Sequence, residues 1–230
     1  MNLKRLLIWL TLFSIAMGYL ETSVVVYLRA IYYPNGFNFP MANMSSAIAI
    51  TELGRELATI IMLAGIGIVA GKNSTQRFAW FLYCFAIWDI FYYVFLKLLL
   101  NWPESLFTWD ILFLIPLPWV GPVIAPVIIS LSMILLALML IFYNEKNPLL
   151  KFNFQEWLLL ISGSLIVIIS FILDCYRCIH VYKGEVLDAI AEYVPLQFDW
   201  WIFWTGELLI LIAISLFCLR AKRVIREKRK

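Results

Sequence analysis

Six apolar runs, each close to the length that crosses a lipid bilayer, dominate this sequence. They cover residues 6–28, 46–70, 78–100, 123–142, 157–173 and 200–219. A helix of about 20 apolar residues spans a hydrocarbon core roughly 30 Å thick. With 63% hydrophobic and 14% charged residues, and a mean hydropathy of +0.89, the chain does not have the composition of a soluble domain. We therefore predict an all-α fold, a polytopic transmembrane helical bundle of about six spans that forms one integral membrane domain over residues 1–230.

The positions of the basic residues predict the orientation of this bundle. Most of the 18 Lys and Arg residues lie in four places, which are Lys4 and Arg5, Lys72 and Arg77, Lys146 and Lys151, and the tail 220–230. Six spans put all four places on one side of the membrane. Because cytoplasmic loops are enriched in Lys and Arg, we expect both termini in the cytoplasm. We interpret the basic tail as a topology signal that contacts anionic lipid, and we predict no nucleic-acid partner.

The stretch from residue 109 to residue 143 is too long for one simple crossing and is interrupted by proline. Its prolines are Pro116, Pro118, Pro122 and Pro126. Proline lacks a backbone donor and disfavours helix in the residue before it. We therefore predict an irregular or re-entrant segment over residues 111–122, placed before the fourth span as a lid or floor of a cavity. A long helix kinked by proline is the alternative.

Three ionisable residues lie in the N-terminal part of the second apolar run. Spacings of three and four residues place Glu52, Arg55 and Glu56 along one helix face, together with Thr59. Charges that face lipid cost several kcal/mol, so this face is expected to look at other helices. Two interpretations remain open at this point. The charges either join two helices as a structural pair or form part of a functional site.

Further acidic residues map to the outer half or the middle of the membrane. The hypothesis of a shared ligand- or ion-binding pocket includes Glu21, Glu52, Arg55, Glu56, Asp89, Tyr93 and Glu207. Carboxylates in excess over buried cations must be protonated, hydrated or bound to a cation. We therefore expect an acidic pocket, open to the outside, that binds a proton, an ion or a small polar ligand in a carrier, a channel or a ligand-binding protein. The sequence leaves the identity of any metal ion open.

A second candidate site is the pair Cys175 and Cys178, which follows the fifth run on the expected outer side. That compartment is oxidising, so a disulfide or a reactive dithiol is chemically reasonable. A structural disulfide, two ordinary thiols and a membrane thiol-disulfide oxidoreductase are the alternatives. Attachment of a c-type haem requires His directly after the second Cys, whereas Ile179 precedes His180 here.

Several other chemistries are excluded by the sequence. The chain has 1 histidine, which rules out an internal bis-His haem and a metalloprotease with two His ligands. It has neither a Walker phosphate loop nor a Gly-x-Ser-x-Gly nucleophile motif. We therefore predict no catalytic residue and no cofactor. A non-catalytic subunit of a larger complex, with membrane-protein partners, remains an alternative to a carrier.

Four motifs resemble those of a family of uncharacterised bacterial multi-pass membrane proteins. They are Glu21 with residues 25–29, the turn that holds Glu52, Arg55 and Glu56, Trp88-Asp89, and the stretch 109–122. The resemblance covers roughly the first two thirds of the chain and does not include the cysteine pair. It implies a location in the bacterial inner (cytoplasmic) membrane. It implies no activity and no catalytic residue.

Overall fold

The computed structural model describes residues 2–42, 44–115, 117–182, 190 and 192–228. Its long helices are α1 (Leu3–Tyr32), α2 (Ser46–Ala70), α3 (Ser74–Leu100), α4 (Ile124–Lys146), α5 (Phe154–Val181) and α7 (Trp200–Glu227). Within the described part of the chain, these 6 helices are long and apolar enough to cross a membrane. The prediction of an all-α bundle with six spans is therefore confirmed. Pro116 and positions 229–230 of the predicted tail lie outside the described residues.

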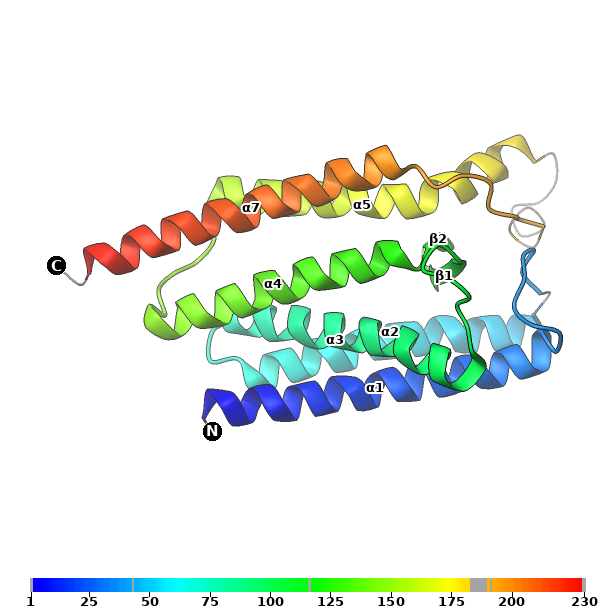
Figure 1. Ribbon diagram of the computed structural model, residues 1–230, viewed down its shortest axis with the longest axis horizontal. Helices are drawn as coiled ribbons and strands as arrows, with labels where there is room; N and C mark the ends of the chain where they lie inside the picture. Colours follow the sequence, from blue (N-terminus) through cyan, green and yellow to red (C-terminus); the bar gives the residue numbers. More distant parts are fainter. Residues whose placement is uncertain (1, 43, 116, 183–189, 191, 229–230) are drawn as a thin grey trace.

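The helices run roughly along one axis, and α4 joins two groups of them (Figure 1). Helix α3 packs against α1, α2 and α4, while α5 and α7 pack against each other along much of their lengths. The two groups make contact where α4 meets α7, and also where the ring of Phe78 of α3 lies against that of Trp157 of α5, 5.5 Å between centroids. Both chain termini lie at one end of the bundle (Figure 1), which we call the terminal end. The opposite end, where α1 ends and α2 begins, is called the hairpin end.

A two-stranded antiparallel hairpin occupies the proline-rich segment at the hairpin end (Figure 1). Strand β1 (Trp109–Phe113) pairs with β2 (Trp119–Pro122), with Asp110 opposite Gly121. Aromatic and β-branched residues favour strands, and Pro122 lies at the end of its strand, where it is tolerated. The prediction that this segment is not a regular helix is thus confirmed. The alternative of a proline-kinked helix is wrong, since a hairpin turns the chain back on itself before α4.

The hairpin packs closely against α5 because of one glycine. A Cβ atom at Gly121 would lie 2.8 Å from ring atoms of Phe171 and 3.0 Å from Phe198. A side chain at this position would therefore force the strand away from the helix. The segment packs between α5 and the α1–α3 group, and its role as a lid or floor of a cavity stays a prediction.

Two helices extend well beyond the predicted spans. Helix α5 continues to Val181 rather than ending at residue 173, and α7 continues to Glu227 rather than residue 219. The charges at the end of α5 do not stop the helix because neighbouring segments bind them. Asp174 accepts hydrogen bonds from the Tyr193 hydroxyl and the Leu196 N–H, at 2.7 and 3.1 Å. The basic residues of α7 are good helix formers, and cations are favourable near a helix C-terminus.

Candidate functional site

Arg55 connects α1 and α2 in the half of the bundle nearer the hairpin. Its Nε atom donates to Glu52 Oε2 at 2.7 Å, and its Nη1 atom forms an ion pair with Glu21 of α1. The Thr59 hydroxyl, one turn further along α2, donates to Glu21 Oε2 at 3.4 Å. The predicted face of α2 therefore does look at another helix. Both interpretations of these charges, a structural pair and part of a functional site, remain compatible with this geometry.

Glu56 adds a third carboxylate to this group without adding a cation. Its two oxygens accept the backbone N–H of Leu114, which follows β1, at 3.2 and 3.1 Å. The Glu56 side chain also interacts electrostatically with Arg55, Glu21 and Glu52. Two carboxylates thus pair with the Arg55 guanidinium and a third lies near it, so the group as a whole has excess negative charge when its acids are ionised. We call Glu21, Glu52, Arg55 and Glu56 the acidic cluster.

A second ion pair joins α1 to the hairpin. Arg29 Nη2 lies 3.3 Å from Asp110 Oδ1, and both side chains are buried. The Arg29 guanidinium also lies over the rings of Trp102 and Phe37, 3.8 and 4.6 Å from their centroids. Burial raises the pKa of Asp110 to about 6, and the charge of Arg29 opposes that rise. Our sequence prediction did not include Asp110, although its place in a Trp-Asp pair like Trp88-Asp89 is a usable signal.

Tyr93 and Asp110 carry buried polar atoms that lie close to each other. Tyr93 Oη and Asp110 Oδ2 have no hydrogen bond of ordinary geometry in the described part of the chain, but the Tyr93 hydroxyl is near enough to act as a hydrogen-bond donor to the Asp110 carboxylate. Their neighbour Tyr92 interacts electrostatically with both Arg29 and Arg55. This region therefore extends from the acidic cluster to Asp110. Because buried polar atoms are nearly always hydrogen-bonded, it is suited to binding a polar species.

Asp89 lies deeper, between α3 and α4. It accepts a hydrogen bond from the Ser130 hydroxyl at 2.7 Å and interacts electrostatically with Asp110. The structure thus places Asp89 beside the Tyr93 region. Sequence reasoning could not identify Ser130 as its partner, because a single serine in an apolar helix carries no distinctive pattern.

Glu207 lies apart from the other predicted site residues. It accepts a hydrogen bond from the Ser132 hydroxyl of α4, and its Oε2 atom has no hydrogen-bond partner among the described residues. Its carboxylate is 1% exposed and lies where α4 meets α7. The structure therefore brings six of the seven predicted residues into one region and leaves Glu207 in another.

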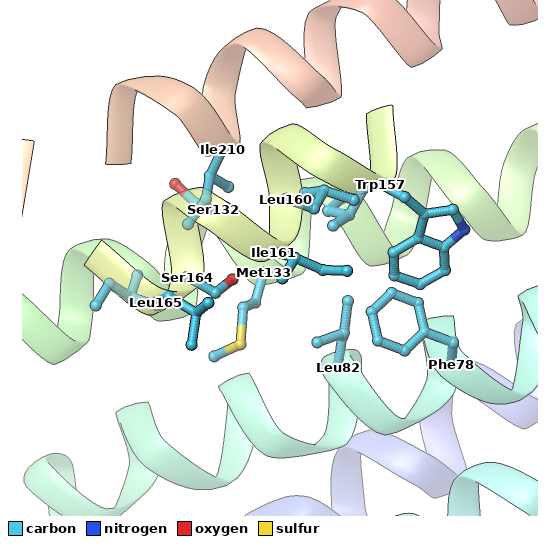
Figure 2. Close-up of a pocket in the computed structure, with 12 residues that line it drawn as sticks. Phe78, Leu82, Ser132, Met133, Trp157, Leu160, Ile161, Ser164, Leu165 and Ile210 are labelled. Carbon is cyan, nitrogen blue, oxygen red and sulfur yellow. The ribbon is translucent and has the colours of Figure 1, made fainter. Parts of the chain in front are cut away.

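An apolar cavity of about 330 Å³ lies beside Ser132. It is lined by residues of α3, α4, α5 and α7, and Figure 2 shows the rings of Phe78 and Trp157 facing each other on one side of it. Ser132 and Ile210 lie on another side (Figure 2). Its walls are otherwise mostly aliphatic, and none of the acidic cluster lines it. This cavity is therefore distinct from the pocket predicted by the sequence.

Cys175 and Cys178 are free thiols on the last two turns of α5. Cys175 is buried, and Cys178 is partly buried. The pair lies within the helix, which continues past residue 173, where the predicted span ended. Whether the pair has a redox role remains a prediction.

A further buried ion pair at the terminal end was not predicted. Arg220 of α7 donates to both oxygens of Glu156 of α5, at 2.8 and 2.6 Å. Glu156 also accepts the Asn153 N–H and so forms a capping box with that residue. The Asn-x-x-Glu spacing before an apolar run is the sequence signal that identifies this glutamate as a helix cap. Its fully buried position gives it a structural role.

Among the described residues, no group of three or more His, Cys, Asp and Glu side chains is arranged to hold a metal ion. Comparisons with the models of protein families, with curated proteins and with solved structures found no match. The resemblance to bacterial membrane proteins therefore stays a prediction. The candidate site is defined by geometry alone.

Proposed function

We propose that this integral membrane protein binds a proton, a small cation or a small polar ligand at the acidic cluster, as a carrier, a channel or a ligand-binding protein. One observation carries the proposal, namely that the guanidinium of Arg55 pairs with both Glu21 and Glu52, while the adjacent Glu56 adds a third carboxylate that forms no ion pair with a described residue. Excess carboxylates in a low-dielectric region are costly unless a proton or cation neutralises them. A bound cation would supply the missing positive charge.

A hydroxyl and a carboxylate next to the acidic cluster also support the proposal. Tyr93 Oη and Asp110 Oδ2 are buried close to each other without a hydrogen bond of ordinary geometry among the described residues. A hydroxyl and a carboxylate oxygen in this arrangement can together bind a cation or a polar group. The proposed site therefore runs from Glu56 to Asp110, along the side of α3 that faces α1 and the hairpin.

We place this site on the outer side of a bacterial cytoplasmic membrane, with both termini in the cytoplasm. Most of the Lys and Arg residues lie at the terminal end, and the acidic cluster lies near the start of α2, in the opposite half of the bundle (Figure 1). This arrangement agrees with the enrichment of Lys and Arg on the cytoplasmic side. It would give the ligand access from outside.

Replacing Glu56 by Gln tests the proposal. The amide removes one charge, while its carbonyl oxygen can still accept the Leu114 N–H, so the fold is preserved. We expect the parent protein, purified in detergent, to show a thermal unfolding temperature that rises with Na⁺, K⁺ or protons. In vesicles that contain a pH-sensitive dye, movement of protons would be reported directly. Both responses should be lost in Glu56→Gln.

The matched control is Glu104→Gln, which removes the same charge from an exposed position outside the acidic cluster. It should respond to cations as the parent does. If Glu56→Gln and Glu104→Gln both respond as the parent does, the acidic cluster is a structural joint and the proposal is wrong.

Two alternative functions suggested by the sequence can be tested separately. A thiol-disulfide oxidoreductase would trap a mixed disulfide on Cys175 or Cys178, and the burial of Cys175 argues against such an exchange. A subunit of a larger complex would purify with partner proteins in stoichiometric amounts. Mass spectrometry after purification in mild detergent would test both.

A further inference from the structure

A second cavity, of about 250 Å³, lies between α4 and α7 near the terminal end. It is lined by three apolar or aromatic residues and three cations, which are Phe142, Tyr143, Ile225, Lys146, Lys222 and Arg226. The cations come from both helices and converge on one cavity. Basic residues that only set the orientation in the membrane need not line a common cavity. The convergence of these three cations therefore indicates a binding site.

These three cations form no ion pair within the fold. None of them forms an ion pair with a described residue, in contrast to Arg220, which binds Glu156 on the same helix. Lys146 instead lies over the ring of Phe142, 3.7 Å from its centroid. A cavity lined by three unpaired cations attracts an anion, and phosphate is the anion that Lys and Arg bind well together.

An apolar path leads along α4 to this cavity. Leu131, Leu135, Leu138 and Phe142 follow one another at spacings of three and four residues, and all are exposed. That spacing places them on one face of the helix, and Lys146 follows one turn after Phe142. The face could accommodate hydrocarbon chains, with a phosphate at its end.

We propose that the cavity between α4 and α7 binds the phosphate of an anionic phospholipid, whose acyl chains lie along the exposed face of α4. Basic pockets between membrane helices on the cytoplasmic side are suited to such headgroups. The site is independent of the acidic cluster, which lies in the other half of the bundle. A phospholipid headgroup and an inorganic phosphate ion both offer a phosphate group to this cavity. Inorganic phosphate is therefore the competing ligand.

Titration of the detergent-purified protein with short-chain phosphatidylglycerol tests this proposal, with native mass spectrometry and thermal unfolding as readouts. The double variant Lys222→Gln/Arg226→Gln removes two cavity cations, both at exposed positions. It should bind the lipid roughly 20-fold more weakly than the parent. Lys146→Gln, which changes the other helix, should weaken binding by roughly fivefold.

The control is Lys4→Gln/Arg5→Gln, which removes the same charge at the same end of the bundle, on α1. It should bind phosphatidylglycerol as the parent does. An equal loss in this control would show diffuse attraction and overturn the proposal, as would equal binding of phosphatidylcholine. Competition by inorganic phosphate at the lipid's own concentration would assign the cavity to a free anion and overturn the lipid as its occupant.

Discussion

Both carboxylate oxygens of Glu56 accept one backbone N–H, that of Leu114, at 3.2 and 3.1 Å. This bond fastens the end of β1 to α2, a helix that otherwise packs mainly against α3. The same carboxylate belongs to the acidic cluster, so one side chain both anchors the hairpin and contributes charge. Its two roles can be separated, because glutamine keeps the acceptor and loses the charge.

Removing the charge of Arg29 should destabilise the protein strongly. In Arg29→Met, Asp110 would remain buried without its cation, and we expect a loss of about 3–5 kcal/mol in the free energy of unfolding. Chemical denaturation in detergent would measure it. The double variant Arg29→Met/Asp110→Asn should recover most of the loss, because no charge is then left unpaired. A stability of Arg29→Met equal to that of the parent would show that water already solvates Asp110.

The contact between α5 and α7 depends on two glycines. A Cβ atom at Gly163 would lie 2.7 Å from the Gly206 carbonyl oxygen, and one at Gly206 would lie 2.7 Å from the Gly163 carbonyl oxygen. We expect Gly163→Ala and Gly206→Ala each to lower the free energy of unfolding by about 1–3 kcal/mol, because the helices must separate.

Gly54 and Gly65 of α2 are the matched controls for these glycines. A Cβ atom there meets nothing within 4 Å. Alanine is the better helix former, so Gly54→Ala and Gly65→Ala should be neutral or stabilise the protein by up to about 1 kcal/mol. Thermal unfolding of all four variants would compare them. Similar losses at all four positions would contradict a role for close helix packing.

The Arg220–Glu156 pair should matter far more than the other cations of the tail. In Arg220→Ala, a carboxylate that is 1% exposed loses both of its guanidinium hydrogen bonds, and we expect destabilisation by about 3–5 kcal/mol. Arg223 is exposed on the same helix, and Arg223→Ala should change the stability by less than about 0.5 kcal/mol. Denaturant titration of both variants is the measurement. Equal effects would mean that the pair adds nothing beyond surface charge.

Cysteine labelling tests the proposed orientation. Asn35 lies beyond α1 at the hairpin end, and Gln155 lies at the start of α5 at the terminal end; both are exposed. In intact cells, a membrane-impermeant maleimide should label Asn35→Cys, while Gln155→Cys should be labelled only after permeabilisation. Labelling of the parent protein measures the background signal from its own partly exposed thiol, Cys178. The reverse pattern would place the termini outside.

The sequence by itself determined the class of this protein and the number of its apolar helices. Six long apolar runs require helices, because lipid offers no hydrogen-bond partners to the backbone. The sequence also placed Glu52, Arg55 and Glu56 on one helix face, because the spacing of residues along a helix depends only on their positions in the sequence. It also excluded a regular helix in the proline-rich segment. It did not reveal the hairpin itself, because the pairing of two strands depends on tertiary context, such as the close packing of Gly121 against Phe171 of α5.

Only the tertiary structure decided which charges meet. The distance between Glu21 and Arg55, or between Arg220 and Glu156, depends on how helices pack side by side, and that packing involves residues far apart in the sequence. The structure also separated Glu207 from the acidic cluster, because α4 lies between α3 and α7. The composition determines how many charged side chains a membrane helix must shield from lipid. The contacts between helices determine which residues pair with those charges.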